Sequence, residues 1–281
     1  MQATDYAMAV TDSFALPDAC TRIKELLEDP SSTAADIADV VSLDPSLSTK
    51  LLKLANSALY NFNAEISTIS RAVSAIGAKA LYSLVMTETA RSAFKHFENN
   101  AVNLERFWQQ SVYAGLIAKH LAIDTGQKDT ERFFLLGLLH NFGELAVANR
   151  SPELASQCEQ SEGTQIPWEK QKQLLGFTYA ECSAQILMLW NLPSSLFTPI
   201  ANQHNESLAL KQTDIAILYL AVRLALQCAI PGAKESVHLV SAEIINSLKL
   251  SEAELESVIL SSKVESYKIL SIMNPELFAS P

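Results

Sequence analysis

The stretch TERFFLLGLLHNFGELAVAN, residues 130–149, decides how this sequence is interpreted. Its apolar residues recur at helical spacing, and His140 and Asn141 stand side by side near its middle, among leucines and phenylalanines. We expect one helix over the whole stretch. In such surroundings His140 is first of all a core histidine whose ring nitrogens are hydrogen-bonded, and Asn141 can bond to neighbouring helix ends.

Helix signals of the same kind extend along the whole chain. Start and stop signals are Thr33 with Asp36, Asp44 before Pro45, Ser67, Gly77, Thr178 with Glu181, and Ser251 with Glu254. Further periodic stretches cover about 78–96, 103–123, 167–175, 178–190, 194–204, 213–229 and 251–272. No segment shows sustained two-residue alternation between turn residues, so the sequence predicts an all-α fold.

Composition and charge limit the classes of function. The chain has 281 residues, of which 48% are hydrophobic, so it can bury a sizeable core. Its net charge is −10, and no cluster of Lys and Arg is present. A duplex-binding surface needs such a cluster, so we expect no nucleic-acid partner.

The cysteines and the longest apolar run indicate the compartment. Cys20, Cys158, Cys182 and Cys228 are scattered, and no signal peptide precedes them, which predicts a cytoplasmic protein with reduced thiols. The longest apolar run, 215–230, is interrupted by Arg223 and is shorter than the ~20 residues of a membrane span. We therefore expect a buried core helix there and no membrane association.

A series of short motifs gives a family resemblance. In chain order they are LP (16–17), VSLDPSL (41–47), LLKLANSA (51–58), ISTISRAV (66–73), IG (76–77), FW (107–108), GLLHNFG (137–143), LGF (175–177), WNLP (190–193) and IANQH (200–204). Over about residues 14–260 the chain resembles the HDOD family, the HD-related output domain of bacterial signalling proteins. The resemblance implies a multi-helical N-terminal subdomain (1–100) packed on an HD-domain-like helical subdomain (101–232), followed by a C-terminal helical tail (233–281).

The resemblance also implies a degenerate metal site. Catalytic HD phosphohydrolases hold divalent metals with His residues, an adjacent His-Asp pair and a distal Asp. The matching positions here are Gln110, His140, Asn141, Tyr179, Gln203 and His204, and the distal Asp falls near Val222 or Arg223. Asn141 offers a cation only a dipole where the family's Asp offers a full charge. Tyr179 and Gln110 could fill the old metal cavity with hydrogen bonds of their own.

The leading hypothesis is therefore a stand-alone, non-catalytic signal-transduction module, a pseudoenzyme without a metal cofactor. It would act by contact with a protein partner or by binding a small ligand in the vestigial pocket. The alternative is a metal-dependent phosphohydrolase with one divalent metal at His140 and His204, completed by a substitute ligand from Glu144, Glu181 or Asp214. A third hypothesis is a structural or oligomerisation domain without a ligand.

Overall fold

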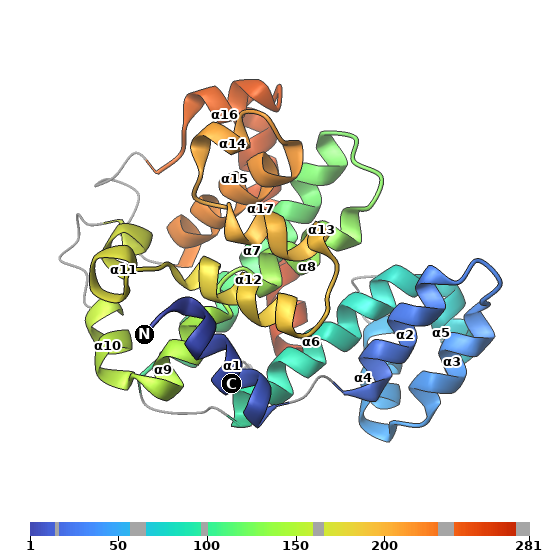
Figure 1. Cartoon of the computed structure of the whole chain (residues 1–281). Coiled ribbons are helices and arrows are strands. Elements are labelled where there is room, and N and C mark those ends of the chain that lie inside the picture. The colour runs from blue at the N-terminus through green and yellow to red at the C-terminus, as the bar shows by residue number, and fades with distance from the viewer. Residues whose placement is uncertain (15–16, 57–65, 97–100, 160–165, 230–238, 274–281) are drawn as a thin grey trace. The chain divides into compact units, whose positions relative to one another are not determined.

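The computed structural model describes residues 1–14, 17–56, 66–96, 101–159, 166–229 and 239–273. These residues form helices and connecting loops with no strand among them, which confirms the predicted all-α class (Figure 1). Contacts divide the chain into two compact units. Unit 1 comprises Met1–Ala15 with Phe94–Lys263, and unit 2 comprises Leu16–Ala93 with Val264–Pro281.

Unit 2 contains a run of consecutive helices. They are α2 (Asp18–Glu28), α3 (Ala34–Ser42), α4 (Pro45–Ala55), α5 (Ile69–Ile76) and most of α6 (Ala78–His96). Asn56 ties the end of α4 to the following chain, because its side-chain amide donates to the Ile66 carbonyl at 2.7 Å and accepts from the Ile66 amide at 2.8 Å. Within this unit the buried Cys20 thiol is hydrogen-bonded to Thr89 at 2.8 Å.

Unit 1 contains the other helices. They are α1 (Ala3–Ser13), α7 (Leu104–Asp124), α8 (Thr130–Leu139), α9 (Gly143–Arg150), α10 (Pro152–Glu159), α11 (Pro167–Leu175), α12 (Tyr179–Leu189), α13 (Ser194–Ala201), α14 (Glu206–Ala209), α15 (Thr213–Ala229), α16 (Ala242–Ser247) and the first half of α17 (Glu252–Met273). Helices α7, α8 and α15 pack against one another and form the centre of the unit. At the crossing of α7 and α8, a Cβ on Gly137 would lie 2.3 Å from the Ala114 carbonyl, so only glycine permits this approach.

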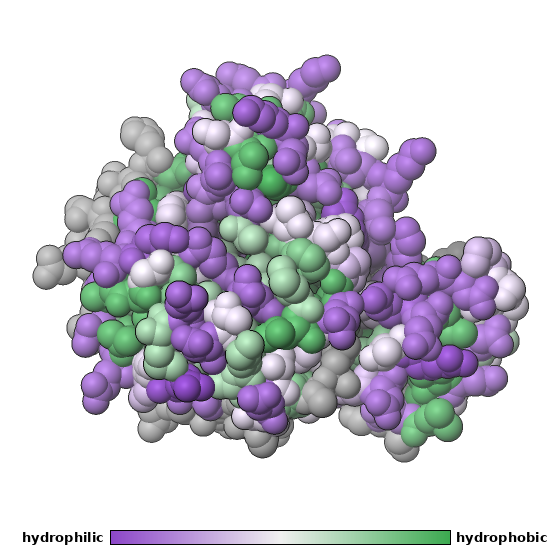
Figure 2. Space-filling view, viewed as in Figure 1, coloured by the Kyte–Doolittle hydropathy of each residue, from purple (hydrophilic) through white to green (hydrophobic). Residues whose placement is uncertain are grey.

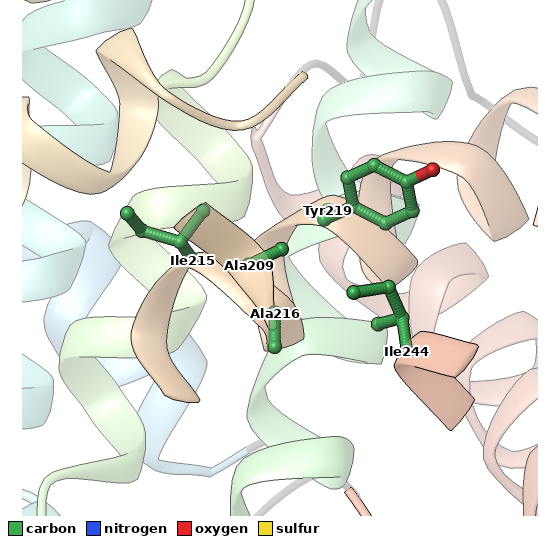
Figure 3. Packing of buried hydrophobic residues seen from close by; sticks show 5 residues of the cluster. All are labelled: Ala209, Ile215, Ala216, Tyr219 and Ile244. Atoms are coloured by element: carbon green, nitrogen blue, oxygen red, sulfur yellow. The ribbon is translucent and has the colours of Figure 1, made fainter. Parts of the chain in front are cut away.

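Two further contacts complete unit 1. Helix α1 lies against α9 and α12, where the Tyr6 hydroxyl is hydrogen-bonded to Ser151 at 2.9 Å (Figure 1). Helix α16 joins the unit through a small apolar cluster, in which Ile244 of α16 lies on the side of Tyr219 of α15 (Figure 3). The hydroxyphenyl ring of Tyr219 also reaches the site described below.

The division into units differs from the expected boundaries at 100 and 232. Both boundaries fall within ranges that the structure does not describe, 97–100 and 230–238. Residues 1–15 group with unit 1 because α1 packs on α9 and α12, and α16 groups with unit 1 because Ile244 packs on α15. These contacts join residues far apart in the sequence, and local sequence patterns do not reveal them.

Most helix signals have the expected geometry. Thr33 with Asp36 and Thr178 with Glu181 form capping boxes, and Asp44 caps α4 by accepting from the Leu47 amide at 3.0 Å. One prediction was wrong: the side chain that caps α5 belongs to Thr68, which accepts from the Arg71 amide at 3.3 Å, and not to Ser67. Gly77 ends α5 with a positive φ of 91°.

On the face shown in Figure 2, hydrophilic residues dominate and apolar areas are interspersed among them. No single described helix is long and apolar enough to cross a membrane, and only the bent pair of α5 with the first part of α6 passes by length and composition.

Candidate functional site

The segment 140–142 breaks the helix that the sequence predicts over 130–149. Helix α8 ends at Leu139 and α9 begins at Gly143. Between them the chain makes tighter, three-residue hydrogen bonds, from the Phe142 amide to the Leu139 carbonyl at 3.3 Å and from the Glu144 amide to the Asn141 carbonyl at 3.0 Å. The expectation of one continuous helix was wrong, and the break is what places His140 and Asn141 beside α12.

Gly143 allows that placement. A Cβ on Gly143 would lie 2.3 Å from the Tyr179 carbonyl oxygen and 2.6 Å from Cys182 Cβ, so the starts of α9 and α12 touch through backbone. The Gly143 amide donates to the Ser183 hydroxyl oxygen at 2.8 Å, and this oxygen lies 3.1 Å from the His140 carbonyl. The close contact brings the first turn of α12, with Tyr179, to the same place as His140.

A cavity of about 90 Å³ lies at this junction, within unit 1. All six positions named from the sequence line it, namely Gln110, His140, Asn141, Tyr179, Gln203 and His204. Of the three substitute ligands, Glu144 lines it as well, whereas Glu181 and Asp214 do not. Glu181 caps α12 and pairs with Lys172 at 2.8 Å, and Asp214 pairs with Arg132 at 2.9 Å.

One side of the cavity, here called the ionic side, consists of Arg106, Asn141, Glu144 and Glu159. Arg106 Nη2 donates to Glu144 at 2.9 Å and to Glu159 at 2.5 Å, and the Asn141 amide donates to the other oxygen of Glu144. The Glu144 side chain is only 4% exposed. Burial raises the pKa of Glu144 to about 7, although the Arg106 charge pulls it down.

A second group of lining residues, here called the imidazole side, consists of His140, Gln203 and His204. His140 and Gln203 are each 1% exposed. His140 Nδ1 lies 2.5 Å from the Gly137 carbonyl and must donate to it, which leaves Nε2 as an acceptor. Burial lowers the pKa of His140 to about 4, and burial followed by the charge of Arg223 lowers that of His204. Both imidazoles are therefore neutral at pH 7.

Aromatic rings and a buried arginine pack against the imidazole side. The Trp168 ring stacks on His204 with centroids 4.3 Å apart, and the Arg223 guanidinium lies 4.4 Å from the Trp168 centroid and 3.2 Å from that of Tyr219. Arg223 is 3% exposed and donates to the carbonyls of Gln203 and Tyr219. Burial lowers its pKa to about 10, so it keeps its charge at neutral pH.

These residues do not fit a divalent metal. In the part of the chain that the structure describes, no three His, Cys, Asp or Glu side chains are placed to share an ion. Asn141 offers Glu144 an N–H, and the Glu144 carboxylate is already bound by Arg106. The Arg223 charge stands close enough to disfavour protonation of His204, and it would oppose a metal cation there in the same way.

Comparison with known proteins identifies the family. A family model of the HDOD domain matches residues 14–206. The chain belongs to the HDOD family. An uncharacterized protein of Treponema pallidum (strain Nichols) is 30% identical over 211 residues, which are 73% of this chain and 40% of that protein. The chain therefore spans less than half of the length of this HDOD relative.

Two crystal structures of other proteins have a fold similar to that of this chain. An HDOD domain protein of unknown function from Geobacter sulfurreducens is 23% identical, with a TM-score of 0.76 over 99% of this chain and 98% of the other. A candidate signal transduction protein from Marinobacter aquaeolei VT8 is 23% identical, with a TM-score of 0.75 over 96% of this chain and 60% of the other.

Two residues of the site, Arg106 and Trp168, were not assigned to it from the sequence, and Arg223 entered the site only as a position near the family's distal Asp. Arg106 stands one helical turn before Gln110 on α7, so a shared helix face was the available signal. Arg223 was noticed as an interruption of an apolar run, and a lone arginine inside a core helix is itself a signal of a buried polar site. Trp168 lies in the short helix α11, and no local pattern links it to His204.

Proposed function

We propose that this chain is a non-catalytic, HDOD-type signal-transduction module of the cytoplasm. It acts by contact with a protein partner or by holding a small ligand in the cavity around His140. The name of the Marinobacter relative supports a signalling role. The four cysteines lie in the described part of the chain and none forms a disulfide, which supports a reducing compartment.

One observation carries the non-catalytic part of the proposal. The two carboxylates that line the cavity, Glu144 and Glu159, are both bound by Arg106, and Glu144 is also bound by Asn141. In an HD enzyme the carboxylate beside the histidine serves the metal. Here an arginine takes the place of that positive charge, and the imidazoles are left without an acidic partner.

The competing function is a phosphohydrolase with one metal at His140, His204 and Glu144. Elemental analysis of tag-free protein, purified without chelator and then incubated with Mn, Fe or Zn, separates the two. We expect metal well below one equivalent and no phosphodiester hydrolysis above that of the His140→Ala variant. A stoichiometric metal that His140→Ala loses, together with turnover dependent on His140, would overturn the proposal.

A further inference from the structure

The imidazole side of the cavity contains polar atoms that nothing in the described chain satisfies. His140 Nε2, Gln203 Oε1 and His204 Nδ1 are buried and have no hydrogen-bond partner, and the same holds for Arg106 Nε on the ionic side. Buried polar groups without partners are rare in folded proteins, and each one costs about 1–3 kcal/mol. With the Tyr179 hydroxyl oxygen, which also has no hydrogen-bond partner, five such atoms surround one cavity, and they point to a bound molecule.

Existing hydrogen bonds fix what each of these atoms requires. His140 Nδ1 donates to Gly137, so His140 Nε2 is a lone pair that needs a donor. The Gln203 amide nitrogen faces the His140 carbonyl at 3.4 Å and His204 Nε2 at 3.3 Å, so Gln203 Oε1 is a second acceptor. If His204 Nε2 accepts from Gln203, His204 Nδ1 carries the proton and is a donor.

The cavity therefore presents two acceptors, on His140 and Gln203, and donors on His204 and Arg106. The Tyr179 hydroxyl, which lies beside the Cys158 thiol, is a further polar group at its wall. An anion such as phosphate or a carboxylate offers only acceptors, and it would face the lone pairs of His140 Nε2 and Gln203 Oε1. The positive charges do not compensate, because Arg106 is bound to two carboxylates and Arg223 lies against Trp168 and Tyr219.

We propose that this cavity binds an uncharged amide edge, that is, an N–H or NH₂ group next to a carbonyl. The ligand's N–H donates to His140 Nε2 or Gln203 Oε1, and its carbonyl accepts from His204 or Arg106. Size agrees with this class, because an engineered cavity of about 150 Å³ accepts benzene, and one of about 90 Å³ suits a group of roughly four heavy atoms. The inference rests on the proposed function, since a metal on His140 would occupy the same lone pair.

Three probes of nearly equal size test the donor requirement. Acetamide carries the N–H and the carbonyl, acetone lacks the N–H, and acetate carries only acceptors and a negative charge. Protein labelled with ¹⁵N-histidine is titrated with each probe, and the ring nitrogen shifts of His140 and His204 are followed by NMR. We expect a saturable shift of His140 Nε2 with acetamide, and apparent affinities at least tenfold weaker for acetone and acetate.

Two neighbouring amides serve as a variant and its matched control. Gln203→Leu removes one cavity acceptor and should weaken acetamide at least tenfold. Asn202→Ala removes the adjacent amide, which donates to the Thr198 carbonyl and does not line the cavity, and should leave acetamide binding unchanged. No saturable shift with acetamide, equal binding of acetone or acetate, or equal loss in both variants would overturn the inference.

Metal content is measured on the sample before the titration. A stoichiometric metal on His140 would reject the proposed function together with this inference. If metal-free protein shows no saturable shift with acetamide, the amide site alone is rejected. The proposed function then remains as a module that acts by protein contact.

Discussion

The two sides of the cavity differ in how their buried polar groups are satisfied. On the ionic side, the Arg106 guanidinium supplies a positive charge, and Glu144, Glu159 and Asn141 are all bound to one another or to it. On the imidazole side, His140 and Gln203 keep buried lone pairs without partners. The carboxylates of the ionic side are bound within it, which serves the fold and leaves only Arg106 Nε open, whereas the imidazole side leaves atoms of all three of its residues open to a ligand.

The largest expected effect on stability comes from removing Arg106, which binds both carboxylates of the ionic side. Arg106→Met leaves Glu144 without its charge partner, so the buried carboxyl must either keep an unpaired charge or take up a proton as its pKa rises further, and we expect the free energy of unfolding at pH 7 to fall by about 2–4 kcal/mol. Urea unfolding followed by circular dichroism measures it. Arg132→Met is the matched control, because Asp214, its partner, is 36% exposed and the pair should contribute about 1 kcal/mol or less.

Equal losses in these two arginine variants would contradict the contrast. The double variant Arg106→Met with Glu144→Leu should recover part of the stability, because an apolar pair of similar volume avoids the unpaired buried charge. If the double variant is less stable than Arg106→Met alone, the carboxylate of Glu144 has a favourable partner other than Arg106.

The pH dependence of stability sharpens the contrast, because the two sides titrate with opposite signs. The pKa of His140 falls to about 4 on folding, so between about pH 4 and 6.5 the unfolded chain binds the extra proton and stability rises with pH. The pKa of Glu144 rises to about 7, so between about pH 4.5 and 7 the folded chain binds the extra proton and stability falls as pH rises. In the overlapping window the two contributions oppose each other.

Substituting Glu144 or His140 alone should therefore reveal the contribution of each group to the pH dependence of the free energy of unfolding. Between about pH 5 and 6.5, Glu144→Gln should make the free energy of unfolding rise more steeply with pH than in the wild type, by up to about 1.4 kcal/mol per pH unit. His140→Asn should change the slope in the opposite direction. Urea unfolding at half-unit pH intervals measures both. Slopes that change in the same direction would contradict the pKa shifts attributed to burial.

The sequence predicted the parts of the fold that local interactions determine. The bounds of α6 at 78–96 and α15 at 213–229 follow from periodic apolar residues, and the capping box at Thr178 follows from side chains three residues apart. It did not predict the break at 140–142. The apolar pattern continues through the break, while the hydrogen bond that holds it joins Gly143 to Ser183, forty residues away.

The candidate site shows the same division. The family pattern named six positions that the fold brings to one cavity, because the framework of helices is retained. The partners that set their chemistry were not predictable, since Arg106 meets Glu144 and Glu159 across 38 and 53 residues. Trp168 of α11 stacks on His204, a contact between residues far apart in the sequence. Which charges balance in a buried site is decided by tertiary contacts.

The smallest expected effect belongs to the imidazole side. Gln203→Leu removes two long hydrogen bonds, of 3.3 and 3.4 Å, and also an unpartnered buried oxygen. The Ser183 hydroxyl lies 3.1 Å from the His140 carbonyl and 2.9 Å from the Tyr179 carbonyl, so its one proton is shared and replaces part of the lost hydrogen bond. The gain and loss nearly cancel, and we expect the free energy of unfolding to change by no more than about 1 kcal/mol.

Asn141→Leu, on the ionic side, removes a donor to a buried carboxylate and should lower the free energy of unfolding by about 1.5–3 kcal/mol. Urea unfolding of both variants in ligand-free buffer compares them. A loss at Gln203 as large as that at Asn141 would mean that the imidazole side also serves the fold and is not kept open for a ligand.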